Sequence, residues 1–324
     1  MRLIKRAFES AALALTGLFL VVALGHAAVP PSGESKAVHP PKVTATKPAV
    51  SKPATAARSG TKRSKQDRPD VRSSSVLVID ANDSAILFAK HADVAAPIAS
   101  ITKLMTALVV LEGGQPLGDT LEITQDDRVR GKGSASRLVV GTKLSRGDFL
   151  HIALMSSDNR AAHAVARSYP GGLPAFVRAM NAKAQALGMT SAHFVDPAGL
   201  SELNLASAED LCLLVTAAAR NPTVRKYSTD HEHSVVVARH KIEFHNTNAL
   251  VRRADWNILV QKTGFTNEAG QCLVMKAVIR DRPVVIVLLD SFGKYTRVAD
   301  ARRIRKWLEA KSVERAVPAV ADRA

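Results

Sequence analysis

Residues 97–103 read PIASITK, and the organisation of the chain can be worked out from what surrounds this stretch. Ser100 and Lys103 are three positions apart, so on a helix they share one face. At a helix N-terminus the backbone N–H of Ser100 can bind an oxyanion. The helix dipole and any nearby cation disfavour a charged Lys103, which would suit this lysine to act as base for the serine hydroxyl. Many helices contain such a pair by chance, so the pair alone is weak evidence.

The flanking sequence predicts two strands followed by a buried helix. Short apolar runs at 76–79 and 85–88 are separated by residues 82–84, Asn-Asp-Ser, which are typical of a hairpin turn. Apolar residues then recur at helical spacing over 101–111, nearly all round the helix, and the glycine pair at 113–114 ends it.

The rest of the chain predicts an α+β fold. Further helices are expected at 147–167, 173–187, 207–220 and 296–310, and further strands at 256–262, 271–280 and 283–290. This order favours one antiparallel sheet built from both ends of the chain and flanked by helices, with a mostly helical subdomain inserted in the middle. A site between the sheet and the helical block would lie in a natural cleft.

A second motif, Ser157-Asp158-Asn159, falls in the predicted helical block. The Ser157 hydroxyl could pass a proton toward a leaving amine, and the Asn159 amide could hold a substrate carbonyl or the lysine. Serine and asparagine are also common in turns and helix caps, so this motif alone does not define a site.

A third motif, Lys262-Thr263-Gly264, follows a predicted strand at 256–261. A strand beside a cleft can pair with an extended peptide through backbone hydrogen bonds. Gly264 would let a substrate backbone approach closely, and the N–H of Phe265 would be a second oxyanion donor. Lys262 would attract a substrate carboxylate and lower the pKa of a nearby Lys103. An ordinary surface strand is the alternative interpretation.

The three motifs occur in this order in class A β-lactamases and penicillin-binding proteins. Over about residues 74–310 the sequence resembles the low-molecular-mass penicillin-binding proteins, a family of D-alanyl-D-alanine carboxypeptidases and endopeptidases. Other matching stretches are 194–200, 208–211 and 246–248, and those at 155–162 and 292–296 resemble the small endopeptidase branch. The resemblance implies a β-lactamase/DD-peptidase-like fold with a five-stranded antiparallel sheet.

The resemblance also implies a mechanism. The implied roles are nucleophile for Ser100, base for Lys103, proton transfer and positioning for Ser157 and Asn159, and substrate binding for Lys262 and Thr263. The acyl-enzyme would be hydrolysed, and penicillins, as covalent inhibitors, would acylate the same serine. The substrates would be cross-linked stem peptides of peptidoglycan, and no metal or organic cofactor is implied.

Two activities within the family stay open, and one is favoured. Carboxypeptidases typically carry a C-terminal β-domain and an amphipathic anchor, for which residues 311–324 are too short, so an endopeptidase is favoured. A class A β-lactamase is disfavoured because its deacylating glutamate precedes an asparagine by four positions, and Leu200, not Glu202, stands there before Asn204. A non-catalytic wall-binding module is disfavoured because the motif residues are intact.

The first thirty residues predict export. A positively charged start at 2–6, an apolar run at 11–24 and small residues at 25–28 follow the order of a signal peptide. We therefore expect a cleaved signal peptide at 1–28 and a periplasmic mature protein, with an uncleaved N-terminal anchor as the alternative.

Residues 29–72 predict a disordered basic linker, because they are rich in Pro, Lys, Ala, Thr and Ser and have little to bury. The chain has a net charge of +16, and residues 31–72 hold ten Lys/Arg against three Asp/Glu. Such a linker suits contact with an anionic wall or membrane surface, or serves as a solvated spacer. Nucleic acid is disfavoured as a partner because aromatic residues make up only 4% of the chain. The catalytic domain is expected at 73–312 and a frayed tail at 313–324.

Cys212 and Cys272 could pair in an oxidising compartment. Both lie in apolar runs, so two buried free thiols are the favoured interpretation. Their spacing does not suggest a metal site.

Overall fold

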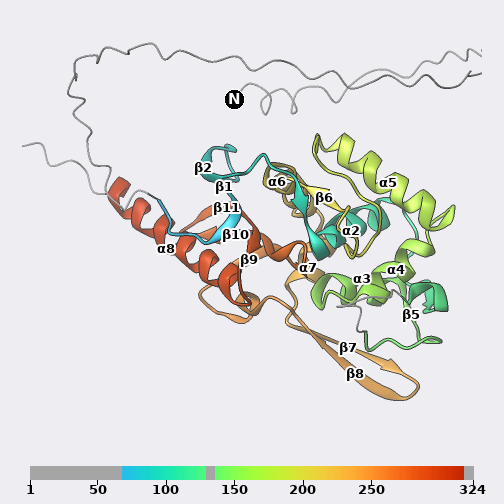
Figure 1. The fold of residues 1–324 in the computed structure, drawn as a ribbon. Helices are drawn as coiled ribbons and strands as arrows, with labels where there is room; N and C mark the ends of the chain where they lie inside the picture. The colour runs from blue at the N-terminus through green and yellow to red at the C-terminus, as the bar shows by residue number, and fades with distance from the viewer. Residues whose placement is uncertain (1–67, 129–135, 317–324) are drawn as a thin grey trace, which may run out of the picture. The chain divides into compact units, whose positions relative to one another are not determined.

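The central sheet joins the two ends of the described chain (Figure 1). The computed structural model describes residues 68–128 and 136–316, with side chains to residue 311. Five strands lie in the order β2-β1-β11-β10-β9, and all neighbours are antiparallel. Their bounds are β1 Ser73–Asp80, β2 Ile86–Lys90, β9 Asn257–Thr266, β10 Gly270–Ile279 and β11 Arg282–Ser291. The pairing of β1 with β11 confirms the prediction of one sheet built from both ends of the chain.

Helices cover both faces of the sheet, which explains the continuous apolar runs inside β1, β10 and β11. One face packs against α8 (Thr296–Ala316), and the other packs against α6 (Ala208–Ala218), which in turn contacts α2 (Thr102–Glu112) in the same core. Successive residues of a strand point to opposite faces. In β1, Val78 accordingly lies in the core beneath α8, and Leu77 lies in the larger core shared with α2 and α6.

The predicted helical block is present, but one of its helices is divided. The remaining helices are α3 Arg146–Met155, α4 Asn159–Arg167, α5 Gly172–Ala186 and α7 Pro222–Thr229. The prediction of a single helix at 147–167 is wrong because the chain turns between α3 and α4. Ser157 there has a φ of 64°, and Asp158 caps α4 by accepting a hydrogen bond from the Ala161 N–H at 3.0 Å. The break places the second motif at the N-terminus of α4.

The hairpin of β7 (Glu232–Val237) and β8 (His240–His245) is absent from the prediction, and so is α7. The hairpin extends away from the other elements in Figure 1. Its turn consists of Ala238 and Arg239, with φ of 47° and 69°, instead of the Asn-Gly or Asp-Gly pair that signals such a turn. The shorter elements are β3 Ala96–Pro97 paired with β6 Leu205–Ala206, β4 Thr120–Glu122 paired with β5 Lys143–Ser145, and 3-10 turns η2 Ala99–Ile101, η3 Gln125–Asp127 and η4 Ala249–Arg252.

The signal peptide expected at 1–28 and most of the linker expected at 29–72 lie outside the described residues. At the other end, α8 continues to Ala316, past its expected end at residue 310 and into the tail that was expected to fray. Within the described part of the chain, no helix combines the length and the apolar character needed to span a bilayer. Cys212 and Cys272 are buried free thiols, which confirms the favoured interpretation.

Candidate active site

The first motif forms the turn that leads into α2. Ser100 lies in η2 and Lys103 lies in the first turn of α2. Lys103 is completely buried, and its Nζ lies 2.7 Å from each of three oxygens: Ser100 Oγ, Asn159 Oδ1 and the carbonyl of Ala198. The serine hydroxyl is therefore in direct hydrogen-bonding contact with an amine that could accept its proton.

Burial makes the Lys103 ammonium group easier to deprotonate. It lowers the pKa of Lys103 to about 7, although the nearby carboxylates of Asp196 and Asp158 act in the opposite direction. A neutral amine has one lone pair and two N–H groups, which together match the three oxygens around Nζ. Near neutral pH a large fraction of this side chain can therefore accept the hydroxyl proton of Ser100.

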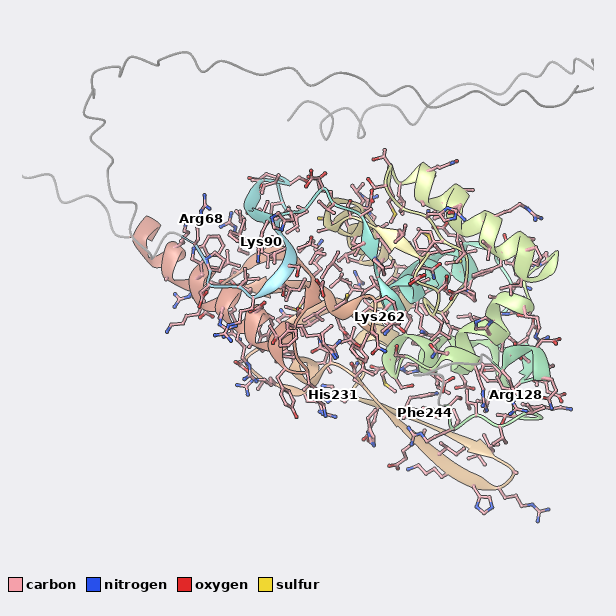
Figure 2. All side chains as sticks on the ribbon, viewed as in Figure 1. Arg68, Lys90, Arg128, His231, Phe244 and Lys262 are labelled. Atoms are coloured by element: carbon pink, nitrogen blue, oxygen red, sulfur yellow. The ribbon has the colours of Figure 1, made fainter. Side chains whose placement is uncertain are left out.

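The third motif lies inside β9, not after the end of the strand, because β9 continues to Thr266. β9 is an edge strand, and Figure 2 shows Lys262 at the junction of the sheet and the helical block. The buried Lys262 Nζ donates hydrogen bonds to Ser157 Oγ at 2.9 Å and to the Thr263 carbonyl at 2.8 Å, which joins the second and third motifs. Burial first, and then the charge of Lys103, lower the pKa of Lys262. The sequence predicts the reverse effect, a lowering of the Lys103 pKa by Lys262, whereas burial is what lowers the pKa of Lys103.

Gly264 brings β9 against the turn that carries the nucleophile. A Cβ on Gly264 would lie only 2.9 Å from the carbonyl oxygen of Ile98 and 3.3 Å from the nitrogen of Ser100. The sequence-based prediction assigns this space to a substrate backbone, whereas the structure fills it with the protein's own turn. The missing side chain thus sets how closely β9 can approach Ser100.

The remaining predicted residues surround this centre. Asn159 is buried and contacts Lys103, and Ser157 is half-buried beside Lys262. The Oγ1 atoms of Thr263 and Thr247 lie 2.6 Å apart. The side chain of Phe265 is exposed near the end of β9. The structure therefore gathers the predicted site residues at one place, from η2, α2, the turn before α4 with the start of α4, and β9.

The loop that contains Asp196 braces the site and is absent from the predicted set. Asp196 Oδ1 accepts hydrogen bonds from the N–H groups of Ala198 and Gly199 at 2.7 and 2.6 Å, and the Ala198 carbonyl in turn contacts Lys103. A Cβ on Gly199, whose φ is 76°, would lie 1.9 Å from the carbonyl oxygen of Ala99. The sequence Asp-Pro-Ala-Gly signals a turn, but it does not signal which helix the turn contacts.

Arg297 links α8 to the sheet beside the site through hydrogen bonds, and it is also absent from the site residues predicted from the sequence. Its Nη1 donates hydrogen bonds to the carbonyls of Gly264 at 2.6 Å and Cys272 at 3.1 Å. The N–H and C=O of one trans peptide point in opposite directions. Because the Gly264 carbonyl points toward Arg297 and β10, the N–H of Phe265 points toward the free edge of β9. A lone arginine at the start of a helix carries no sequence signal for this role.

Glu202 and Asn204 do not form the base of a β-lactamase-type site. The Glu202 side chain is exposed to solvent. Asn204 is buried, and its Oδ1 accepts a hydrogen bond from the Val195 N–H at 2.7 Å while its Nδ2 donates to the Asp196 carbonyl at 3.0 Å. Asn204 therefore holds the loop that braces Lys103.

The chain is similar in sequence and in structure to known proteins. A sequence model of the D-alanyl-D-alanine carboxypeptidase family matches residues 61–293. The chain is 48% identical over 254 residues to a D-alanyl-D-alanine endopeptidase of Pseudomonas aeruginosa, covering 78% of this chain and 82% of the relative. It is 46% identical over 256 residues to a D-alanyl-D-alanine endopeptidase of Escherichia coli, with the same coverage, 78% and 82%. A Streptomyces DD-transpeptidase has a similar structure, with a TM-score of 0.71 and 26% identity over 75% of this chain and 99% of that chain.

Proposed function

The chain belongs to the D-alanyl-D-alanine carboxypeptidase family and is a serine D-Ala-D-Ala peptidase, and we propose that it cuts D-alanyl cross-links between peptidoglycan stem peptides. One observation carries the proposal: Ser100 Oγ lies 2.7 Å from the Nζ of a completely buried Lys103. This pair supplies a nucleophile and a base for acyl transfer. The names of the two relatives at 48% and 46% identity support the endopeptidase activity over the carboxypeptidase activity.

In the proposed first step, Lys103 takes the proton of Ser100, and the serine oxygen attacks the carbonyl carbon of the D-alanyl residue. The carbonyl oxygen gains negative charge, which the backbone N–H groups of Ser100 and Phe265 stabilise. The orientation of the Phe265 N–H toward the free edge of β9 supports this role, because the edge faces the nucleophile turn. The amine of the acceptor stem then leaves with the proton that Lys103 took from Ser100, and water hydrolyses the ester, which returns a proton to the Ser100 oxygen.

The other two motifs serve the leaving group. Ser157 Oγ accepts a hydrogen bond from Lys262 Nζ at 2.9 Å, so its own hydroxyl proton can point to the departing amine. Asn159 Oδ1 holds Lys103 beside Ser100. Lys262 and Thr263 belong to the edge strand on the leaving-group side, where their side chains can donate hydrogen bonds to a substrate carboxylate.

The experiment that tests this function compares two substrates. The purified protein is incubated with a cross-linked muropeptide dimer and, separately, with a monomeric pentapeptide, and the products are identified by mass. We expect conversion of the dimer to monomers, and no conversion by Ser100→Ala. Loss of the terminal D-alanine from the pentapeptide with the dimer intact would replace the endopeptidase by a carboxypeptidase.

We further propose that the protein acts in the periplasm after loss of a signal peptide and that penicillins inhibit it by acylating Ser100. The order of charged, apolar and small residues at 1–28 supports export. The exposure of Glu202 supports a long-lived penicillin adduct, because this carboxylate is not positioned to hydrolyse the adduct. The N-terminal mass of protein recovered from the periplasm tests the first proposal. A covalent fluorescent-penicillin band that Ser100→Ala abolishes tests the second.

A further inference from the structure

Three large aromatic side chains remain exposed close to the proposed active site. Phe265, Phe292 and Tyr295 are 57%, 90% and 74% exposed, and we call them the aromatic rim. Every other phenylalanine and tyrosine of the described residues is buried or half-buried. Exposed aromatic rings that gather at one place are typical of binding surfaces, because leaving them in water forgoes the stabilisation that burial would give.

The register of the sheet brings the rim together. Phe265 of β9 pairs with Gln271 of β10, and Gln271 pairs with Ser291 of β11, the residue before Phe292. Neighbouring strands lie about 4.8 Å apart, so the backbones of Phe265 and Ser291 are about 10 Å apart. Phe292, which follows β11, therefore lies at the same end of the sheet as Phe265, whose N–H is part of the proposed oxyanion site.

Hydrogen bonds hold the segment from Phe292 to Arg297 in one conformation. Gly293 has a φ of 84°, and its carbonyl accepts a hydrogen bond from the Thr296 N–H at 3.2 Å. The Thr296 hydroxyl donates to the Phe292 carbonyl, and Arg297 is bonded to β9 and β10. The rings of Phe292 and Tyr295 are thus carried by a hydrogen-bonded turn that is joined to the sheet through Arg297.

The polarity of the proposed site indicates which part of the substrate meets the rim. The N–H of Phe265 marks the position of the scissile carbonyl, and Lys262 and Thr263 lie on the leaving-group side. A substrate paired along β9 therefore extends its acyl-donor part past Phe265. Lys294 adds a positive charge there, with its Nζ 5.6 Å from the centre of the Tyr295 ring.

We infer that the aromatic rim binds the acyl-donor strand of peptidoglycan, namely the stem peptide before the scissile D-alanine and the sugar that carries it. A stem of about four residues spans roughly 13 Å when extended, which is enough to reach across the rim. Its carboxylates match the charge of Lys294, and the apolar faces of the sugar match the aromatic rings. This inference rests on the proposed function, because it uses the direction of the substrate along β9.

The test uses the full chain and the double variant Phe292→Ala/Tyr295→Ala. One substrate is a cross-linked dimer with an intact sugar-linked donor stem, and the other is a dimer whose donor stem is truncated to the residues next to the D-alanine. Loss of two aromatic contacts should lower kcat/KM for the intact donor about tenfold. Cleavage of the truncated donor and the rate of penicillin acylation should stay within about twofold of the wild type, because these need only the Ser100 site.

Two controls accompany the double variant. Phe292→Tyr/Tyr295→Phe keeps both rings and should keep the wild-type preference for the intact donor. Val236→Ala removes a residue that is 67% exposed on β7, away from the site, and should change nothing. The inference is overturned if Phe292→Ala/Tyr295→Ala cleaves the intact donor at the wild-type rate, or loses both donors equally. If the wild type cuts only monomeric pentapeptides, the endopeptidase proposal fails, and the same comparison with intact and truncated pentapeptide donors still tests the rim.

Discussion

Replacing Gly264 by alanine tests whether β9 and the nucleophile turn are as close as the structure places them. The new Cβ would lie 2.9 Å from the Ile98 carbonyl oxygen, 3.2 Å from Ala99 Cβ and 3.3 Å from the Ser100 nitrogen. Carbon–oxygen contacts normally begin at about 3.3 Å, so strand and turn would have to separate by roughly half an ångström. Two of the three atoms belong to the backbone, which cannot rotate out of the way as a long side chain can.

Both stability and rate should respond to this separation. Overpacking of this kind costs about 1–3 kcal/mol, which corresponds to a Tm about 3–10 °C lower for a domain of this size. A displacement of 1 Å at a catalytic group can cost about 100-fold in rate, so half that displacement should slow acylation of Ser100 about tenfold.

The assay is the time course of acylation by a fluorescent penicillin, with thermal unfolding measured on the same samples. Gly118→Ala is the matched control, because its new Cβ would meet no atom within 4 Å. It should acylate and unfold like the wild type. Equal acylation rates and equal Tm values for Gly264→Ala and Gly118→Ala would refute the close approach of β9 to Ser100.

Three further predictions concern groups around the site and in the helical block. Asp196→Asn should destabilise the protein by about 1.5–3 kcal/mol in urea unfolding, because the carboxylate accepts hydrogen bonds from several backbone N–H groups. It should also shift the pH profile of acylation to lower pH, because the charge of Asp196 raises the pKa of Lys103. An unchanged stability and an unchanged pH profile would contradict this role. Burial, more than any other cause, lowers the pKa of His151 to about 4, so the native state binds fewer protons than the unfolded state and loses about 2 kcal/mol of stability as pH falls from 7 to 4.5. His151→Gln should remove this part of the pH dependence of urea unfolding, and the same slope in both proteins would count against it. Glu202→Gln should leave the half-life of the penicillin adduct within about twofold of the wild type, because the side chain is exposed; a much longer half-life would identify Glu202 as a deacylating base.

The sheet, the helix that carries Lys103 and the three motifs could be predicted because their signals are local. Apolar residues alternate or recur at helical spacing in the strands and in α2, and each motif is three residues wide or little more. The division of the helix at 147–167 was not predictable from spacing, because Ser157 adopts a positive φ that serine rarely takes. The hairpin was missed for the related reason that Ala238 and Arg239 form its turn.

The contacts that hold the site residues in place depend on tertiary structure, so no pattern in the sequence predicts them. Asp196 acts through backbone N–H groups, which every residue but proline has, so its partners cannot be read from side-chain types. Arg297 reaches carbonyls on β9 and β10 from the start of α8, and only the packing of α8 on the sheet brings them together. Gly264 was recognised, but whether its space admits a substrate or the protein's own turn depends on the distance from β9 to η2.

The pH dependence of Ser100 acylation by a penicillin tests most directly the claim that a buried Lys103 with a lowered pKa activates the serine. The second-order acylation rate constant should rise with pH through an apparent pKa of about 7 and then level off, because burial lowers the pKa of Lys103 to about 7. A rate that is flat between pH 5 and 9, or that rises only near the pKa of about 10 of an exposed lysine, would contradict the account.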